Sequence, residues 1–113
     1  MEVEKRNDGK LAVLRPAGPL NAAVVDRVRE EWFGWLKNEP EVRTVVVSLA
    51  DVDFMDSSGM GLLISMLKHL GERDGEVRLA ALRKGVRMVF EITRTYKVFD
   101  IYDSVEEAVG NAP

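Results

Sequence analysis

The sequence contains no cysteine, one histidine and four prolines among its 113 residues, and it has no long apolar run. The absence of cysteine excludes disulfides, thiolate catalysis and cysteine-ligated zinc, and it fits a reducing compartment. No uncharged stretch is long enough to cross a bilayer. Residues 1–6 also carry charges where a signal peptide needs an apolar segment. We therefore expect a cytoplasmic protein without a membrane partner.

A concentrated basic face is missing as well. The net charge is −3, and basic residues are scattered among acidic ones. Nucleic-acid binding needs clustered basic residues, because phosphate neutralisation supplies much of the affinity. The nearest candidate, Arg83-Lys84-Gly85-Val86-Arg87, is interpreted as a solvated helix start. His69 falls within a predicted helix and is interpreted as a surface residue, so we expect neither a nucleic-acid partner nor a metal site.

Apolar periodicity predicts about five strands and about four helices. The predicted strands cover residues 2–6, 11–14, 42–49, 77–82 and 98–102. The predicted helices begin at Asn21 as a cap, at Ser57, near Val86, and after Ser104 in a capping box with Glu107. Trp32 and Trp35 belong to the apolar stripe of the first helix and are expected in the core.

The order of these elements predicts an α/β fold. The Asn7-Asp8-Gly9 turn signal indicates an N-terminal hairpin. Strands and helices alternate after it, which is typical of parallel strands joined by right-handed crossovers. The run Val45-Val46-Val47 predicts a central strand covered on both faces. We expect a mixed, mostly parallel sheet in one domain over residues 1–113, with a frayed tail at 110–113.

The segment from Asp51 to Gly61 carries the functional information. It connects the most buried strand to the most buried helix, at the sheet edge where α/β proteins bind ligands and partners. Asp56 is placed to cap the helix, which puts Ser57 in its first turn. Gly59 and Gly61 would leave the helix start without bulk, so that another surface can approach.

A phosphate on Ser57 would act as a switch at this position. It adds about −1.5 to −2 charges, which a helix N-terminus accommodates. A closely packed partner would not accommodate these added charges. Neither would the nearby carboxylates, which belong to Asp51, Asp53 and Asp56. From the residues alone, however, a plain helix cap is favoured over a phosphorylation site, because Asp-Ser caps are common.

The motif Phe54-Met55-Asp56-Ser57-Ser58-Gly59-Met60-Gly61 resembles the signature of the STAS domain, specifically of the bacterial anti-sigma factor antagonists. The preceding Val45-Val46-Val47-Ser48-Leu49-Ala50-Asp51-Val52 is similar to the apolar strand that leads to this signature. The order of elements agrees from about residue 3 to 109. The resemblance implies a single STAS-like domain with a regulatory serine at the start of the signature helix.

The resemblance also implies a mechanism. An anti-sigma factor that is a serine kinase would use ATP to phosphorylate Ser57, with Ser58 as the alternative acceptor, and a serine phosphatase would reset the switch. The unmodified form would bind the anti-sigma factor and release a sigma factor. This chain would be a monomer or weak dimer, with no catalysis, bound cofactor or metal of its own. The implied partner-binding residues are Asn21, Asp53, Asp56, Ser57, Ser58, Gly59, Met60 and Gly61.

Two departures from the family pattern bear on the partner. Gly18-Pro19-Leu20-Asn21 stands where the family usually has an aspartate in the last position, so the charge is lost there. Thr93-Arg94-Thr95-Tyr96 replaces a frequent Thr-Gly-Leu, so that turn is expected to differ. Neither departure touches Ser57.

Three other functions are alternatives to this one. A STAS domain of a transporter or stress-signalling complex would bind a partner without a phosphate switch. A receiver domain phosphorylated on aspartate would need an acidic pair after its first strand, where this chain has Arg15-Pro16-Ala17-Gly18. A serine hydrolase would need a Gly-x-Ser-x-Gly elbow, and Met55 stands where the first glycine belongs.

Overall fold

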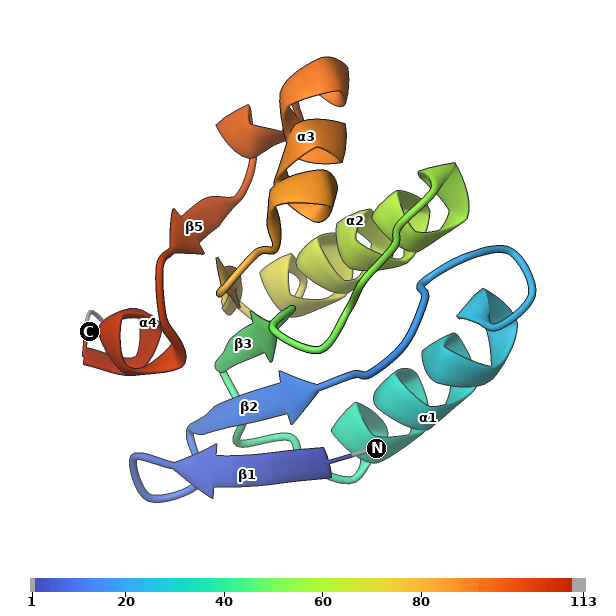
Figure 1. The fold of residues 1–113 in the computed structure, drawn as a ribbon. Helices are drawn as coiled ribbons and strands as arrows, with labels where there is room; N and C mark the ends of the chain where they lie inside the picture. The colour runs from blue at the N-terminus through green and yellow to red at the C-terminus, as the bar shows by residue number, and fades with distance from the viewer. Residues whose placement is uncertain (1, 111–113) are drawn as a thin grey trace.

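The computed structural model describes residues 2–110, which form a five-stranded sheet with helices on both faces (Figure 1). The strands are β1 (Glu2–Arg6), β2 (Leu11–Arg15), β3 (Thr44–Ser48), β4 (Glu76–Ala80) and β5 (Asp100–Tyr102). The helices are α1 (Val25–Lys37), α2 (Ser57–Gly71), α3 (Lys84–Thr93) and α4 (Val105–Gly110), with a 3₁₀ turn, η1 (Thr95–Lys97), after α3. No helix within the described residues is long and apolar enough to span a membrane.

The strands are ordered β1-β2-β3-β4-β5 across the sheet. β1 pairs antiparallel with β2, and every later neighbour pairs in parallel. The hairpin turn places Asn7, Asp8 and Gly9 at φ values of 55°, 58° and 83°, the left-handed region that these three residue types tolerate best. The predicted mixed, mostly parallel sheet with an N-terminal hairpin is therefore confirmed.

β3 lies at the centre of the sheet and is buried along its whole length. Val45 and Val47 face a large core shared with α1, α2 and α3, which includes fully buried Trp32. Val46 faces a smaller core closed by Ala108 of α4. The uninterrupted valine run thus reflects apolar cover on both faces, and Figure 1 shows α4 on the side opposite α1 and α2.

α4 is held by its own cap and by the hairpin. The Ser104 hydroxyl accepts a hydrogen bond from the Glu107 amide at 3.1 Å, as a capping serine does. Arg6 donates to both carboxylate oxygens of Glu106, at 2.9 and 3.0 Å, and this bond lowers the pKa of Glu106. α4 extends through Gly110, so the expected frayed tail does not begin there, and residues 111–113 lie outside the described part.

The turn after α3 uses a left-handed residue without glycine. Arg94 has φ 59° and ends the helix, and its amide bonds to the Glu91 carbonyl at 3.2 Å. Glycine adopts this conformation readily, whereas a residue with a Cβ is strained in it. Arg94 stands where the family pattern has glycine, and its backbone adopts a conformation that glycine would favour.

Replacing Arg94 by glycine should therefore stabilise the protein by about 0.5–1 kcal/mol, because relief of the left-handed strain exceeds the extra entropy of the unfolded chain. Urea unfolding measures the difference. Lys97→Gly is the matched control, since Lys97 is exposed and has no positive φ, and it should destabilise. A loss of stability in both variants would contradict the strain at Arg94.

Candidate functional site

The candidate site lies at the carboxyl ends of β2 and β3, where the loops that leave these strands run side by side. The Gly18 amide bonds to the Asp51 carbonyl and the Leu20 amide to the Phe54 carbonyl, both at 2.9 Å. The Asp56 amide bonds back to the Leu20 carbonyl at 3.3 Å. These bonds continue the parallel pairing of the two strands beyond the sheet, and they hold the start of α2 in place.

Asp56 caps α2, as its sequence position predicted. Its Oδ1 accepts hydrogen bonds from the amides of Ser58, at 2.9 Å, and Gly59, at 3.2 Å. Its Oδ2 accepts a bond from the Ala22 amide at 3.3 Å. One carboxylate therefore satisfies two of the free amides at the helix start and links α2 to the chain that enters α1.

Ser57 is the first residue of α2, and its side chain is exposed. Within residues 2–110, its hydroxyl has no hydrogen-bond partner. Ser58, the alternative acceptor, is only partly exposed, and its amide is engaged by Asp56. The hydroxyl of Ser57 is thus accessible, and nothing in the described structure depends on it.

Asn21 stands one turn before α1 rather than at its cap. Its Oδ1 accepts a hydrogen bond from the Ala23 amide at 3.0 Å, and its carbonyl accepts from Val24 and Val25. α1 begins at Val25, and Val24 occupies the cap position without a side-chain bond. The prediction that Asn21 caps this helix is wrong, because its side chain closes a local turn instead. The turn lies beside Asp56, through the Ala22 amide.

The two glycines of the motif differ in their surroundings. A Cβ on Gly59 would lie 2.9 Å from the side chains of both Leu20 and Met55, and closer still to the Leu20 carbonyl oxygen. A Cβ on Gly61 would meet nothing within 4 Å. The room at Gly59 is thus filled by the chain's own Leu20, and only Gly61 leaves space for another molecule. Met60 is also buried, with 4% of its surface exposed.

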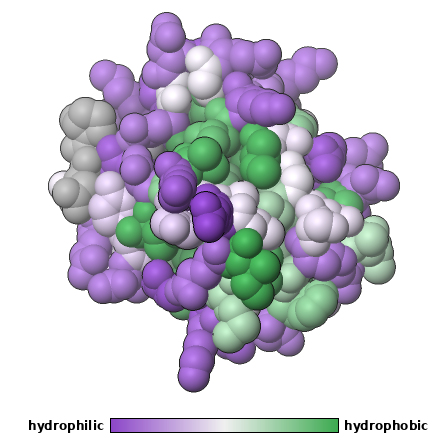
Figure 2. Space-filling model, turned by 90° about the horizontal axis from the view of Figure 1, so that it is seen from above, coloured by the Kyte–Doolittle hydropathy of each residue, from purple (hydrophilic) through white to green (hydrophobic). Residues whose placement is uncertain are grey.

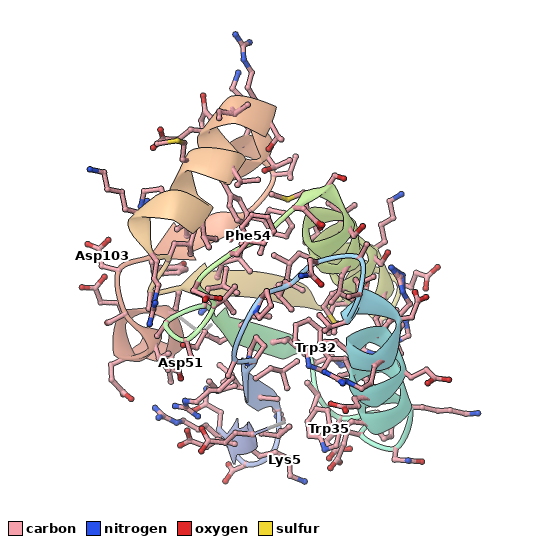
Figure 3. All side chains as sticks on the ribbon, turned by 45° about the vertical axis from the view of Figure 1, so that its right-hand side comes forward. Lys5, Trp32, Trp35, Asp51, Phe54 and Asp103 are labelled. Carbon is pink, nitrogen blue, oxygen red and sulfur yellow. The ribbon has the colours of Figure 1, made fainter. Side chains whose placement is uncertain are left out.

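The loop before Asp56 presents charged and apolar groups outward. Asp51 and Asp53 are exposed, and Phe54 has 53% of its surface exposed. Figure 3 shows Asp51 and Phe54 on this loop, whereas Trp32 points from α1 into the interior. Phe54 was not among the predicted contact residues, although it is the aromatic residue that opens the signature motif. It is exposed here, next to the acidic positions.

Arg83 supports this loop from the opposite side. It immediately precedes α3, and its Nε donates to the Ala50 carbonyl at 2.8 Å. The start of α3 therefore lies beside the candidate site. Within residues 2–110, no group of three or more histidine, aspartate or glutamate side chains is arranged to hold a metal ion. The site thus combines an accessible hydroxyl, a capped helix start and an acidic rim.

Comparisons with known proteins identify similar chains along nearly the whole length. A sequence model of the STAS domain matches residues 2–108. The anti-sigma F factor antagonist of Paenibacillus polymyxa is 24% identical over 109 residues, 96% of this chain and 92% of that protein. The unphosphorylated anti-sigma factor antagonist SpoIIAA superposes with a TM-score of 0.80 and 25% identity, over 96% of this chain and 91% of that one. Phosphorylated SpoIIAA of Bacillus gives 0.71 and 24%, over 96% of both chains.

Proposed function

Because the chain belongs to the STAS domain family, we propose that it is an anti-sigma factor antagonist controlled by phosphorylation of Ser57. In this proposal the unmodified protein binds an anti-sigma factor that is also a serine kinase, and a sigma factor is released. The kinase transfers the γ-phosphoryl group of ATP to the Ser57 hydroxyl oxygen, leaving ADP, and the hydroxyl proton is lost. A serine phosphatase restores the hydroxyl by hydrolysis.

The observation that carries the proposal is the exposed, unbonded hydroxyl of Ser57 at a helix start that is capped by its neighbour. Asp56 supplies the cap through its own carboxylate, so phosphorylation of Ser57 removes no hydrogen bond from the fold. The first turn of α2 holds no acidic residue, and the positive end of the helix dipole tolerates the added charge. The fold can therefore persist in both states.

The same phosphate would oppose binding. It places about −1.5 to −2 charges next to the acidic positions Asp51, Asp53 and Asp56. A partner that packs closely on Gly61 and the Ser57 end of α2 would have to desolvate this charge. Like charges brought together across an interface cost several kcal/mol. An interface centred on Ser57 would therefore be lost while the domain remains folded.

Phosphoryl transfer by the cognate kinase tests the proposal directly. Unmodified protein is used to isolate an ATP-binding anti-sigma factor from the same cell, and the purified pair is incubated with ATP. We expect one phosphate per chain, located on Ser57 by tandem mass spectrometry. Ser58→Ala should still accept one phosphate and Ser57→Ala none. A phosphate on Ser58 alone, or none on any residue, would contradict the assignment of Ser57.

A further inference from the structure

Exposed apolar residues are concentrated on α3 and η1. Among the described residues, five large hydrophobic side chains are exposed, and four of them lie between positions 88 and 98. They are Met88 (51% exposed), Ile92 (76%), Tyr96 (45%) and Val98 (57%). We call this set the α3 face. Figure 2 looks down on the end of the molecule from which α3 rises in Figure 1, and it shows hydrophobic residues gathered there among hydrophilic ones.

A hollow on the β5 side of α3 adjoins this face. It has a volume of about 500 Å³ and is lined by Arg87, Phe90, Glu91, Tyr96 and Ile101. Phe90 is fully buried and packs edge-on against Phe99, with ring centroids 5.8 Å apart. The hollow is therefore lined by both apolar and charged side chains, and the contact between Phe90 and Phe99 holds its inner wall in place. A partner's apolar side chain contributes most to binding where it fills such a well-packed site.

The charges around the α3 face are mostly positive. Residues 83–98 contain five basic residues and one acidic residue, in a chain whose net charge is −3. Arg83 is engaged with the Ala50 carbonyl, and Arg87 lies 3.9 Å from Asp103. Lys84, Arg94 and Lys97 form no ion pair within residues 2–110. An apolar face with unpaired cations at its border is complementary to an apolar surface bordered by carboxylates.

We propose that the α3 face binds an amphipathic helix of a partner protein, in which an apolar stripe is flanked by acidic residues. α3 has ten residues and is about 15 Å long, so about three turns of a partner helix would cover it. Because Arg83 joins the start of α3 to the loop before α2, a partner seated at Ser57 can extend onto this face. The proposal does not depend on the phosphorylation of Ser57.

Two other occupants fit the charges less well. A second copy placed by two-fold symmetry would bring Lys84, Arg94 and Lys97 against the same cations. An anionic membrane would attract these cations but repel the exposed Glu91, Asp100 and Asp103, which lie on or near the same segment. An acidic helix fits these charges better, because residues 83–98 carry five basic residues and one acidic residue, Glu91.

A pair of designed peptides tests the proposal on the full-length protein. The first is a helical peptide with one leucine stripe flanked by glutamates, and the second has lysines in place of the glutamates. We expect the acidic peptide to bind at least about tenfold more tightly and to shift the methyl NMR signals of Met88 and Ile92. Ser57→Asp should leave this binding unchanged, which separates the test from that of the phosphate switch.

Variants of exposed residues locate the binding. Ile92→Ser and Lys97→Glu should each weaken acidic-peptide binding about tenfold, while Lys37→Glu, an exposed lysine on α1, should not. Circular dichroism confirms that the variants fold. The proposal is overturned if the two peptides bind equally, if Ile92→Ser has no effect, or if Ile92→Ser dissociates a dimer in sedimentation. Tighter binding to phosphatidylglycerol vesicles than to the acidic peptide also overturns it.

Discussion

Ser57→Asp is expected to weaken binding of the anti-sigma factor by about a hundredfold or more, because a fixed negative charge at the interface costs several kcal/mol. Ser57→Ala should bind like the unmodified protein and should stay bound in the presence of ATP, since it accepts no phosphate. Calorimetric titration with the purified anti-sigma factor measures both affinities. Thermal unfolding should change little in either variant, since the Ser57 side chain is exposed and unbonded.

The enzymatically phosphorylated protein provides the decisive comparison. Aspartate carries one negative charge, whereas phosphoserine carries about −1.5 to −2, so the modified protein should bind more weakly than Ser57→Asp. Ser58→Asp is the positional control, because Ser58 is partly buried beside Asp56, and its effect should include a loss of stability. If phosphorylated protein keeps the affinity of the unmodified form, Ser57 is not a switch, and the domain binds its partner in some other way.

Local chemistry made parts of this site predictable from the sequence. An Asp-Ser pair before an apolar helical run is a cap signal that acts within four residues, and α2 begins where that signal placed it. The valine run of β3 by itself predicts a strand that is buried on both faces. Both predictions rest on interactions that the neighbouring residues themselves determine.

The remaining features depend on contacts between distant segments. The apolar run from Val98 predicted a strand, but Val98 is exposed and β5 begins only at Asp100, after η1. Phe99 packs inward against Phe90, and Ile101 packs against the same core. The role of Gly59 likewise depends on where the loop after β2 passes. The apolar periodicity of a single segment cannot indicate the contact of Phe99 with Phe90 or that of Gly59 with Leu20, because each contact joins two separate segments.

The packing of Gly59 makes a second large effect testable. Gly59→Ala should lower the free energy of unfolding by about 2–3 kcal/mol, because overpacking of a filled core forces its neighbours to move. The groups in the way are the Leu20 carbonyl and the Leu20 and Met55 side chains. The matched control is Gly61→Ala, two residues further along the same helix. Its Cβ would meet nothing within 4 Å, so it should stabilise α2 by up to about 1 kcal/mol.

The same pair of variants separates the two roles of the glycines. A displaced Leu20 carbonyl would also disturb the Asp56 amide that bonds to it, so Gly59→Ala should weaken partner binding indirectly, together with stability. Gly61→Ala should leave the fold intact and weaken binding only if a partner packs closely on this position. Urea unfolding and titration of both variants distinguish these outcomes. Equal stability of the two alanine variants would mean that the loop after β2 can move aside freely. The conclusion that this loop is rigidly paired with the loop after β3 would then be wrong.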